Sequence, residues 1–342
     1  MSLTLVTSDR FADHLMPPGH PERVERAETM QVVASEWRQR GGQVVEPQPA
    51  SDEQLARIHT RDYINLIRET AGRAVALDPD TVTSPDSYEV ARLAAGAACN
   101  GVDLAMAGAG ARALAMVRPP GHHAERNRAM GFCLFNNVAV AAAHARASGA
   151  GRVAIVDYDV HHGNGTQWSF YDDPSVLFIS SHQYPYYPGT GAAGDVGKDR
   201  GVGFTVNLPL DAGANDADYE LVYRRVAVPI LRQFKPDLIL ISAGFDAHER
   251  DPLAGMRLTT NGFGVLTTMI AAVADEVSGG RVVAVTEGGY DLAALADSLR
   301  TVIRVFARES KPDEFITARP GTSRGEATLR NVLPHVSKYW TI

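Results

Sequence analysis

The chain has 342 residues, of which 45% are hydrophobic and 21% are charged. This is the balance of a globular protein with enough apolar material for a large core. The formal net charge is −7 at pH 7, so the sequence offers no basic surface to neutralise a phosphate backbone. Nucleic acid is therefore not expected as a partner, and the negative charge weakly favours cationic substrates.

Only two cysteines occur, Cys99 and Cys133, and neither lies in a CxxC pair or a cysteine–histidine cluster. Both are predicted to be reduced, buried thiols. No basic segment precedes an apolar stretch, and no apolar run reaches the length of a membrane span. We therefore expect a soluble, cytoplasmic protein without a membrane partner, while association into a homo-oligomer is left open.

Short β-branched runs alternate along the chain with alanine-rich stretches of helical periodicity. In chain order the predicted elements are strand Leu3–Thr7, helix Val24–Trp37, helix Tyr88–Ala107, strand Ala113–Val117, helix Phe135–Ser148, strand Arg152–Val156, strand Ser175–Ser180, helix Asp216–Phe234, strand Asp237–Ile241, helix Gly262–Val277, strand Arg281–Val285 and helix Leu292–Ala307. Strands joined by helical crossovers indicate a parallel sheet with both faces covered. The prediction is one α/β domain over residues 1–342, with a polar surface excursion at Glu309–Glu326.

Side chains capable of chemistry follow each of the last five predicted strands. In chain order these are His122 and His123; Asp157, Asp159 and His161; Ser180 and His182; Asp246; and Glu287 and Tyr290. The carboxyl ends of parallel strands share one edge of the sheet, and ligands bind at that edge. Residues up to about 170 positions apart are therefore expected to converge on one site.

The segment Asp157–Gly163 is the richest of these clusters. Asp159 and His161 are two residues apart, so in an extended stretch they point the same way. With Asp246 they make the three protein ligands that a catalytic zinc needs, and they leave one position open. The oxygen-rich set would also accept Fe(II). Each of these residues alone could equally cap a helix or accept a hydrogen bond from the backbone. The three residues together favour a metal site over such structural roles.

Two further motifs fit such a metal centre. Arg118–His123 places His122 and His123 behind a stiff Pro-Pro-Gly turn, and tandem histidines suit a general acid and base beside a metal-bound water. Glu287-Gly288-Gly289-Tyr290 allows a tight turn that directs Tyr290 across the site, where a phenol could stabilise an oxyanion. A lone His-His pair is more often a surface feature, and a lone Gly-Gly-Tyr is more often a turn with a packed aromatic.

With these motifs in place, the chain resembles the histone deacetylase and acetylpolyamine amidohydrolase superfamily, and in particular class II-like bacterial amidohydrolases. The matching blocks are Gly19–Arg23, Arg118–His123, Gly131–Asn137, Asp157–Gly165, Pro188–Gly191, Ser242–Asp246, Asp251–Leu253, Glu287–Tyr290 and His335 with Tyr339-Trp340. The resemblance implies an arginase-like fold of three layers, in which helices flank a central, mostly parallel sheet. It also implies a zinc-dependent deacetylase.

Residue roles follow from the resemblance alone. Asp159, His161 and Asp246 would bind Zn²⁺, His122 and His123 would be the acid/base pair, and Tyr290 would donate a hydrogen bond in the transition state. Asp157 would orient His122 and, with Ser180, Ser181 and the carbonyls of Asp159 and His161, would bind a structural K⁺. A narrow channel for the acyl-lysine side chain would be lined by Gly131, Phe132, Tyr187 and Leu253.

Two positions bear on mechanism and substrate. Asn164 stands where class I members place a carboxylate behind the second histidine, which should lower the basicity of His123. Leu253 stands where the eukaryotic polyamine-specific branch has Glu, although several bacterial polyamine enzymes carry an apolar residue there. The expected substrate is an acetylated (acylated) lysine side chain or a related amine. The alternatives are an acetylpolyamine or another small acylated amine, and a non-catalytic acyl-lysine binding protein, which the complete set of competent residues disfavours.

Overall fold

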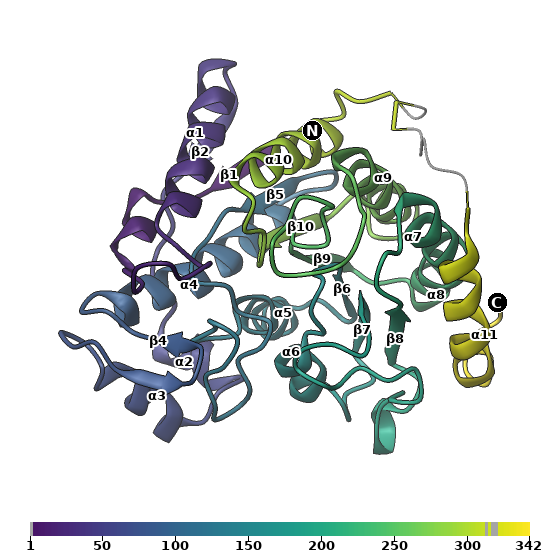
Figure 1. Ribbon diagram of the computed structural model, residues 1–342, viewed down its shortest axis with the longest axis horizontal. Coiled ribbons are helices and arrows are strands. Elements are labelled where there is room, and N and C mark those ends of the chain that lie inside the picture. The colour runs from purple at the N-terminus through teal and green to yellow at the C-terminus, as the bar shows by residue number, and fades with distance from the viewer. Residues whose placement is uncertain (1–2, 312–313, 316–320) are drawn as a thin grey trace.

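The computed structural model describes residues 3–311, 314–315 and 321–342, and within them eight strands form one parallel sheet (Figure 1). The strand order is β2-β1-β5-β10-β9-β6-β7-β8. The strands are β1 (Leu3–Val6), β2 (Gln43–Val45), β5 (Arg112–Ala115), β6 (Val153–Asp157), β7 (Val176–Gln183), β8 (Thr205–Leu210), β9 (Leu238–Ala243) and β10 (Val282–Thr286); β3 (Ala76–Asp78) and β4 (Thr81–Val82) form a separate antiparallel pair. The predicted parallel α/β architecture is confirmed.

Helices cover both faces of this sheet. They are α1 (Glu25–Gln39), α2 (Asp52–Ala56), α3 (Arg61–Arg68), α4 (Ser87–Met106), α5 (Asn137–Ala147), α6 (Asn164–Ser169), α7 (Asp216–Val222), α8 (Val228–Phe234), α9 (Thr260–Val277), α10 (Leu292–Phe306) and α11 (Ser323–Val336), with single turns η1 (Asp9–Asp13), η2 (Asp199–Gly201) and η3 (Tyr223–Ala227). Side chains of α1 and α7–α11 build the core on one face, and those of α2–α5 build it on the other.

The two cores follow from the alternation of side chains along each strand. In β9, Ile239 and Ile241 face the first core while Leu238 and Leu240 face the second, and all four are fully buried. Each such side chain contributes about 1.5–3 kcal/mol by leaving water. Strands buried on both faces read as continuous apolar runs, which is why the sequence identified them. Cys99 and Cys133 are buried free thiols, as predicted.

The sequence missed elements with weaker patterns. β2 is a three-residue strand with exposed ends at one edge of the sheet, and β8, at the other edge, contains Asn207 and Pro209. Helix α11 begins at Ser323, so the predicted surface excursion Glu309–Glu326 is wrong from that residue onward; its residues 312–313 and 316–320 lie outside the described part of the chain. Along Asp216–Phe234 the predicted helix is interrupted by the π-turn η3.

The sheet order explains how distant residues meet. The five strands that precede the chemically capable side chains are neighbours, in the order β5-β10-β9-β6-β7. The register places Asp157, the last residue of β6, beside Ser180 on one side and Ser242 on the other. Loops leaving these strands therefore emerge at one edge of the sheet. Within the described ranges, no helix is long and apolar enough to cross a membrane.

Candidate active site

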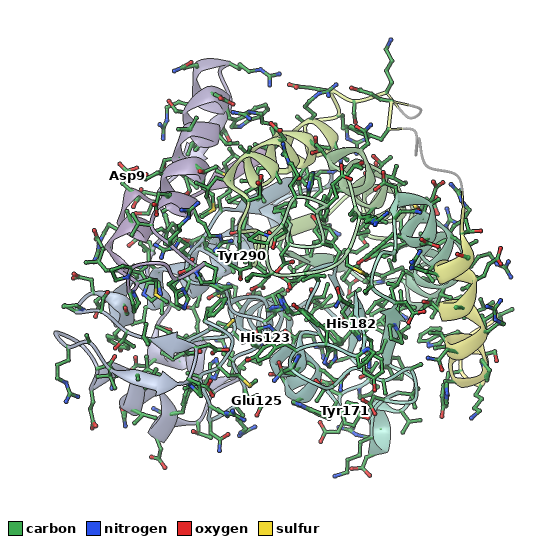
Figure 2. The ribbon with its side chains drawn as sticks, in the orientation of Figure 1. Asp9, His123, Glu125, Tyr171, His182 and Tyr290 are labelled. Atoms are coloured by element: carbon green, nitrogen blue, oxygen red, sulfur yellow. The ribbon has the colours of Figure 1, made fainter. Side chains whose placement is uncertain are left out.

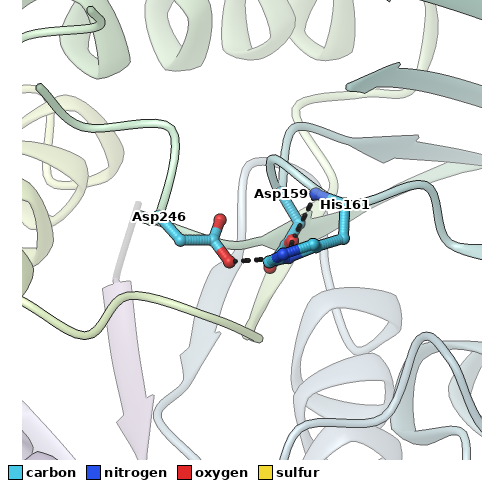
Figure 3. Close-up of side chains that lie close together, drawn as sticks. All are labelled: Asp159, His161 and Asp246. Atoms are coloured by element: carbon cyan, nitrogen blue, oxygen red, sulfur yellow. Dashed lines mark hydrogen bonds and ion pairs between the residues drawn. The ribbon is translucent and has the colours of Figure 1, made fainter. Parts of the chain in front are cut away.

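Three side chains converge at this edge as a candidate metal centre (Figure 3). One ligand atom from each of Asp159, His161 and Asp246 lies within 4.8 Å of the others. His161 Nδ1 is 3.1 Å from Asp159 Oδ1 and 3.1 Å from Asp246 Oδ2. The structure thus brings together the three residues that the sequence nominated, from the loops after β6 and β9.

The carboxylates are held in place by the backbone. Asp159 Oδ2 accepts from the Gly288 N–H at 2.9 Å, and Asp246 Oδ1 accepts from the Val160 N–H at 2.9 Å. The space against them is only wide enough for glycine: a Cβ at Gly244 would lie 2.0 Å from Asp159 Oδ2, and one at Gly288 would lie 2.1 Å from Asp246 Oδ2. The glycines flanking these loops therefore make the room that the ligands occupy.

The charge of the cluster suits a cation. Burial opposes a charge on His161, yet the two carboxylates at its Nδ1 outweigh burial and raise its pKa to about 10. Buried carboxylates need a positive partner. Here two carboxylates face the same imidazole nitrogen, and the single positive charge of one imidazolium cannot neutralise both. Carboxylate oxygen and imidazole nitrogen are ligands for Zn²⁺ and for Fe(II). The residues present therefore fit a divalent metal.

Two adjacent histidines lie beside this cluster and have different partners. His122 Nδ1 is 3.0 Å from Asp157 Oδ2, whereas His123 Nδ1 is 2.8 Å from Asn164 Oδ1. Burial disfavours the charged form of His122, but nearby carboxylates, Asp159 and Asp157, hold its pKa well above the usual range. Burial and the neighbouring imidazoles hold the pKa of His123 well below its usual range. The two imidazoles therefore differ in their affinity for a proton, with the pKa raised for His122 and lowered for His123.

Glu287, which follows β10, fixes the histidine segment. Its Oε2 accepts the N–H groups of Gly121 at 2.6 Å and His122 at 3.1 Å, and its Oε1 accepts the Ser242 hydroxyl at 3.0 Å. The carboxyl is completely buried, and burial raises its pKa to about 7. The sequence placed Glu287 at the edge of the site but gave it no role. The structure shows that it ties the loops after β5 and β10 to strand β9.

The Tyr290 loop is bound from two sides. Asp251 Oδ2 accepts the Tyr290 N–H at 2.7 Å, while Arg26 donates from Nε to the Gly289 carbonyl at 2.8 Å. The Arg26 guanidinium also lies 5.0 Å from the centre of the Tyr290 ring. Gly289 has a φ of +124°, which L-residues rarely adopt, so the turn depends on its glycine and on these contacts. His123 and Tyr290 both lie near the centre of the molecule (Figure 2).

A buried ion cluster that sequence reasoning missed supports this loop. Glu22 accepts from Arg118 Nε at 2.5 Å and from Arg26 Nη1 at 2.8 Å, and all three side chains are fully buried. Burial opposes the charge on Glu22, yet the two guanidinium groups lower its pKa to about 2. Glu22 and Arg118 stand in blocks that carry the family resemblance; an apolar environment around them was not visible from sequence.

The expected channel residues lie around the histidines and Tyr290. The Tyr187 ring packs edge-on against His123 at 5.2 Å, and the Phe132 ring lies edge-on to Tyr290 at 6.0 Å. Phe132 has a φ of +67°, a strained conformation of the kind that clusters at functional sites. A Cβ at Gly131 would lie 2.4 Å from the His123 ring. Gly131 therefore permits the close approach of its loop.

Leu253 is half-buried, and its carbonyl accepts the Tyr186 hydroxyl, whose ring stacks on His161. Tyr186 was not nominated from sequence, where two adjacent tyrosines gave no reason to choose both. Nearby, a cavity of about 320 Å³ opens beside Tyr290, and its walls are residues 16–21, 23–25 and Pro252. The wall next to Tyr290 thus combines prolines with the polar side chains of His20, Arg23 and Glu25.

The residues expected to bind K⁺ surround the last residue of β6. Ser181 Oγ donates to the Asp157 carbonyl at 3.4 Å and lies 2.9 Å from the Tyr223 hydroxyl, while Ser180 Oγ is 2.9 Å from His182 Nδ1. Burial raises the pKa of Asp157. The two serine hydroxyls point to different neighbours, as expected for successive residues of a strand.

Comparison with known proteins supports a common family. Residues 20–306 match the model of the histone deacetylase domain. A histone deacetylase-like amidohydrolase of Pseudomonas aeruginosa is 42% identical over 78% of this chain and 74% of its own length. A probable deacetylase of Archaeoglobus fulgidus is 39% identical over 84% of this chain and 81% of its own length. Human polyamine deacetylase HDAC10 is 40% identical over 84% of this chain, which spans 45% of that protein.

The fold comparison agrees with the sequence comparison. The crystal structure of an HDA15 HD domain superposes with a TM-score of 0.92 at 35% identity, covering 99% of this chain and 95% of that one. The predicted arginase/deacetylase-like three-layer fold is thereby confirmed. A family match over most of the residues, with relatives near 40% identity in bacteria, archaea and eukaryotes, shows that the chain belongs to the histone deacetylase family of amidohydrolases.

Proposed function

We propose that this chain is a zinc-dependent deacetylase, working as a single catalytic domain over residues 1–342, that removes acetyl groups from lysine side chains or related amines. The observation that carries the proposal is the convergence of Asp159, His161 and Asp246 within 4.8 Å, next to an imidazole pair and Tyr290. Three protein ligands with an open position are the arrangement of catalytic zinc sites. Fe(II) would fit the same ligands.

A Zn²⁺ ion bound there would polarise the acyl carbonyl and lower the pKa of a water molecule to about 7. The oxygen atoms around Asp157 make a reasonable site for K⁺, because burial raises the pKa of that carboxyl and a neighbouring cation would offset its charge. Ser180, Ser181 and the carbonyls of Asp159 and His161 would complete that site.

The different partners of the two histidines support different roles. His123, neutral and backed by an amide, takes the proton from the attacking water and returns it to the leaving amine. His122, backed by the Asp157 carboxylate, stays charged and stabilises negative charge. The Tyr290 hydroxyl donates a hydrogen bond to the acyl oxygen as negative charge develops on it, an interaction worth about 3–4 kcal/mol in comparable sites.

The substrate enters as an acylated side chain, with its remaining part outside the channel. Two aromatic rings would form the walls of the channel. The Phe132 ring packs against Tyr290, and the Tyr187 ring packs against His123. The leading alternative substrate is an acetylpolyamine or another small acylated amine, which the similarity to human polyamine deacetylase HDAC10 favours. The apolar Leu253 at the rim offers no carboxylate to a cationic amine, and this favours acetyl-lysine.

The test combines metal analysis with hydrolysis of an acetyl-lysine amide. The purified wild type is expected to hold about one Zn²⁺ per chain and to release acetate. Asp159→Ala, His161→Ala and Asp246→Ala are each expected to lose tight metal binding and activity, since two protein ligands are too few. Stoichiometric zinc in all three variants would refute the metal site. Bound zinc with no hydrolysis of acetyl-lysine, acetylputrescine or acetylspermidine would instead favour a non-catalytic binding protein.

A further inference from the structure

The amide of Asn164 holds the orientation of His123, and a second residue holds the amide. Asn164 Oδ1 lies 2.8 Å from His123 Nδ1, and on its other side Asn164 Nδ2 donates to Glu125 Oε1 at 2.8 Å. The other acceptors near Nδ2 are more distant: the His123 carbonyl at 3.5 Å and Met130 Sδ at 3.4 Å. Glu125 comes two residues after His123 and is half-buried. Figure 2 labels both residues, with Glu125 on the opposite side of His123 from Tyr290 in that view.

An amide facing an imidazole is ambiguous by itself. Turned one way, it accepts a hydrogen bond from Nδ1–H; turned the other way, it donates to an unprotonated Nδ1 and forces the proton onto Nε2. An ionised carboxylate only accepts hydrogen bonds. Glu125 therefore turns the NH₂ group of Asn164 toward itself and the carbonyl oxygen toward His123. The proton of neutral His123 must then sit on Nδ1, which leaves the Nε2 lone pair free.

We propose that Glu125 is a positioning residue that fixes the tautomer of His123 through the Asn164 amide. This inference rests on the proposed function, in which His123 takes a proton from water, because only a free Nε2 lone pair can do so. We call this chain of two hydrogen bonds the relay. In it the amide of Asn164, and not a carboxylate, contacts the His123 imidazole, while the carboxylate of Glu125 contacts the amide. His123 is thus oriented as a base without a full negative charge at Nδ1.

The backbone of Glu125 is held by contacts that do not involve its side chain. The Glu125 N–H donates to the Arg128 carbonyl at 2.9 Å, and the Glu125 carbonyl is 3.0 Å from His59 Nδ1. Removing the side chain therefore leaves the turn 125–128 held by the Arg128 carbonyl and the His59 ring. Since the residue is half-buried, Glu125→Ala is expected to fold, which a melting temperature close to that of the wild type would establish.

The kinetic test is a double-mutant cycle on the metal-loaded protein with an acetyl-lysine amide. Glu125→Ala is expected to lower kcat by roughly ten- to a hundredfold, the effect of losing one charge-assisted hydrogen bond, with little change in KM. Asp78→Asn serves as the matched control. It removes a carboxylate that pairs with Arg128 across the same turn but does not touch Asn164, and it should retain wild-type kcat within about twofold.

In the second half of the cycle, Glu125→Ala is expected to change kcat in the opposite direction. In an Asn164→Asp background the introduced carboxylate accepts from Nδ1–H without help, and Glu125 now repels it. Glu125→Ala should therefore raise kcat in this background although it lowers kcat in the wild type. A change of less than threefold in the wild-type background, or a double variant no more active than Asn164→Asp alone, overturns the relay.

A spectroscopic measurement separates the relay from the proposed function. The ¹⁵N shifts of the His123 imidazole, assigned with His123→Ala, should report the Nδ1–H tautomer in the zinc-loaded wild type and a mixture of tautomers in Glu125→Ala. This reading does not depend on turnover. An inactive wild type with the expected shifts refutes the proposed reaction alone, whereas an active wild type whose tautomer is unchanged by Glu125→Ala refutes the relay alone.

Discussion

Tyr290 is almost completely buried, 6% exposed, and its backbone is held by Asp251. Tyr290→Phe removes one hydroxyl and leaves the ring, the loop and the metal ligands in place. We expect kcat to fall by about 10²–10³-fold, as for other lost oxyanion donors, because the interaction strengthens only in the transition state. Steady-state kinetics measure the change, with zinc content and melting temperature as controls. A variant that keeps more than about a third of wild-type kcat would remove Tyr290 from the mechanism.

Leu253 is proposed to act at the rim of the channel through its side chain, since its backbone N–H donates to Asp251 and its carbonyl accepts from Tyr186. Leu253→Ala should widen the entrance and shift preference toward bulkier acylated amines. Leu253→Glu should raise kcat/KM for acetylspermidine relative to an acetyl-lysine amide, because a carboxylate attracts the additional ammonium groups. Competition between the two substrates measures the ratio of their kcat/KM values directly. A ratio that is the same in the wild type and both variants would argue against Leu253 as a rim contact.

At the scale of elements, the candidate metal centre depends on turns in which glycine leaves room for carboxylates. A Cβ at Gly288 would lie 2.1 Å from Asp246 Oδ2 and 2.8 Å from Asp159 Oδ2. Gly288→Ala must therefore displace two proposed ligands, and it is expected to weaken zinc binding by more than about tenfold. Titration with a zinc chelator measures the loss. Gly108→Ala is the control, since a Cβ there meets nothing within 4 Å; equal zinc affinity in both variants would refute the argument.

The elements themselves were predictable to different degrees. Buried strand β6 carries four apolar residues in succession before Asp157, and β9 carries six apolar or small residues, so the existence and type of both strands were clear. The edge strand β8 includes a proline and an asparagine, because an edge strand has to satisfy only one neighbour. Helix α11 starts in a segment of polar composition and packs against α7 and β8. Its stability comes from that packing, which local sequence does not display.

At the scale of the whole molecule, buried neutral histidines make stability depend on pH. His59 is 1% exposed, its Nε2 accepts the Asn136 N–H at 3.0 Å, and burial lowers its pKa to about 4. The folded pKa lies below the unfolded value of about 6.5. The contribution of His59 is therefore complete above pH 6.5 and is lost as the pH falls toward 4. The loss amounts to about 3 kcal/mol.

Urea unfolding of the wild type and His59→Gln between pH 7.5 and 4 tests this effect. Glutamine cannot take up the proton, so the variant lacks this part of the pH dependence. The free energy of unfolding of the wild type should drop more steeply than that of the variant, by about 3 kcal/mol over the range. Parallel curves for the two proteins would show that His59 does not titrate with unfolding.

The sequence by itself determined the parallel α/β architecture and the composition of the site. Apolar runs with helical crossovers imply a parallel sheet, and a parallel sheet collects its carboxyl ends at one edge. Asp159, His161 and Asp246 could therefore be grouped although they span nearly ninety positions, and the structure brings them within 4.8 Å. The same reasoning grouped His122, His123 and Tyr290, and the family resemblance added the channel residues.

The tertiary structure decided what surrounds these groups. The Glu22–Arg118–Arg26 cluster, the Glu287 contacts and the Glu125–Asn164 contact join residues from separate segments. Polar residues of this kind have no periodic pattern, because each is placed by a single partner that folding brings to it. Burial and the new neighbours together set the pKa of each group: two guanidinium groups lower the pKa of Glu22 against the effect of burial, while burial and neighbouring imidazoles lower the pKa of His123. Ligand identity was thus encoded locally, whereas protonation and orientation depend on the distances that only the folded chain creates.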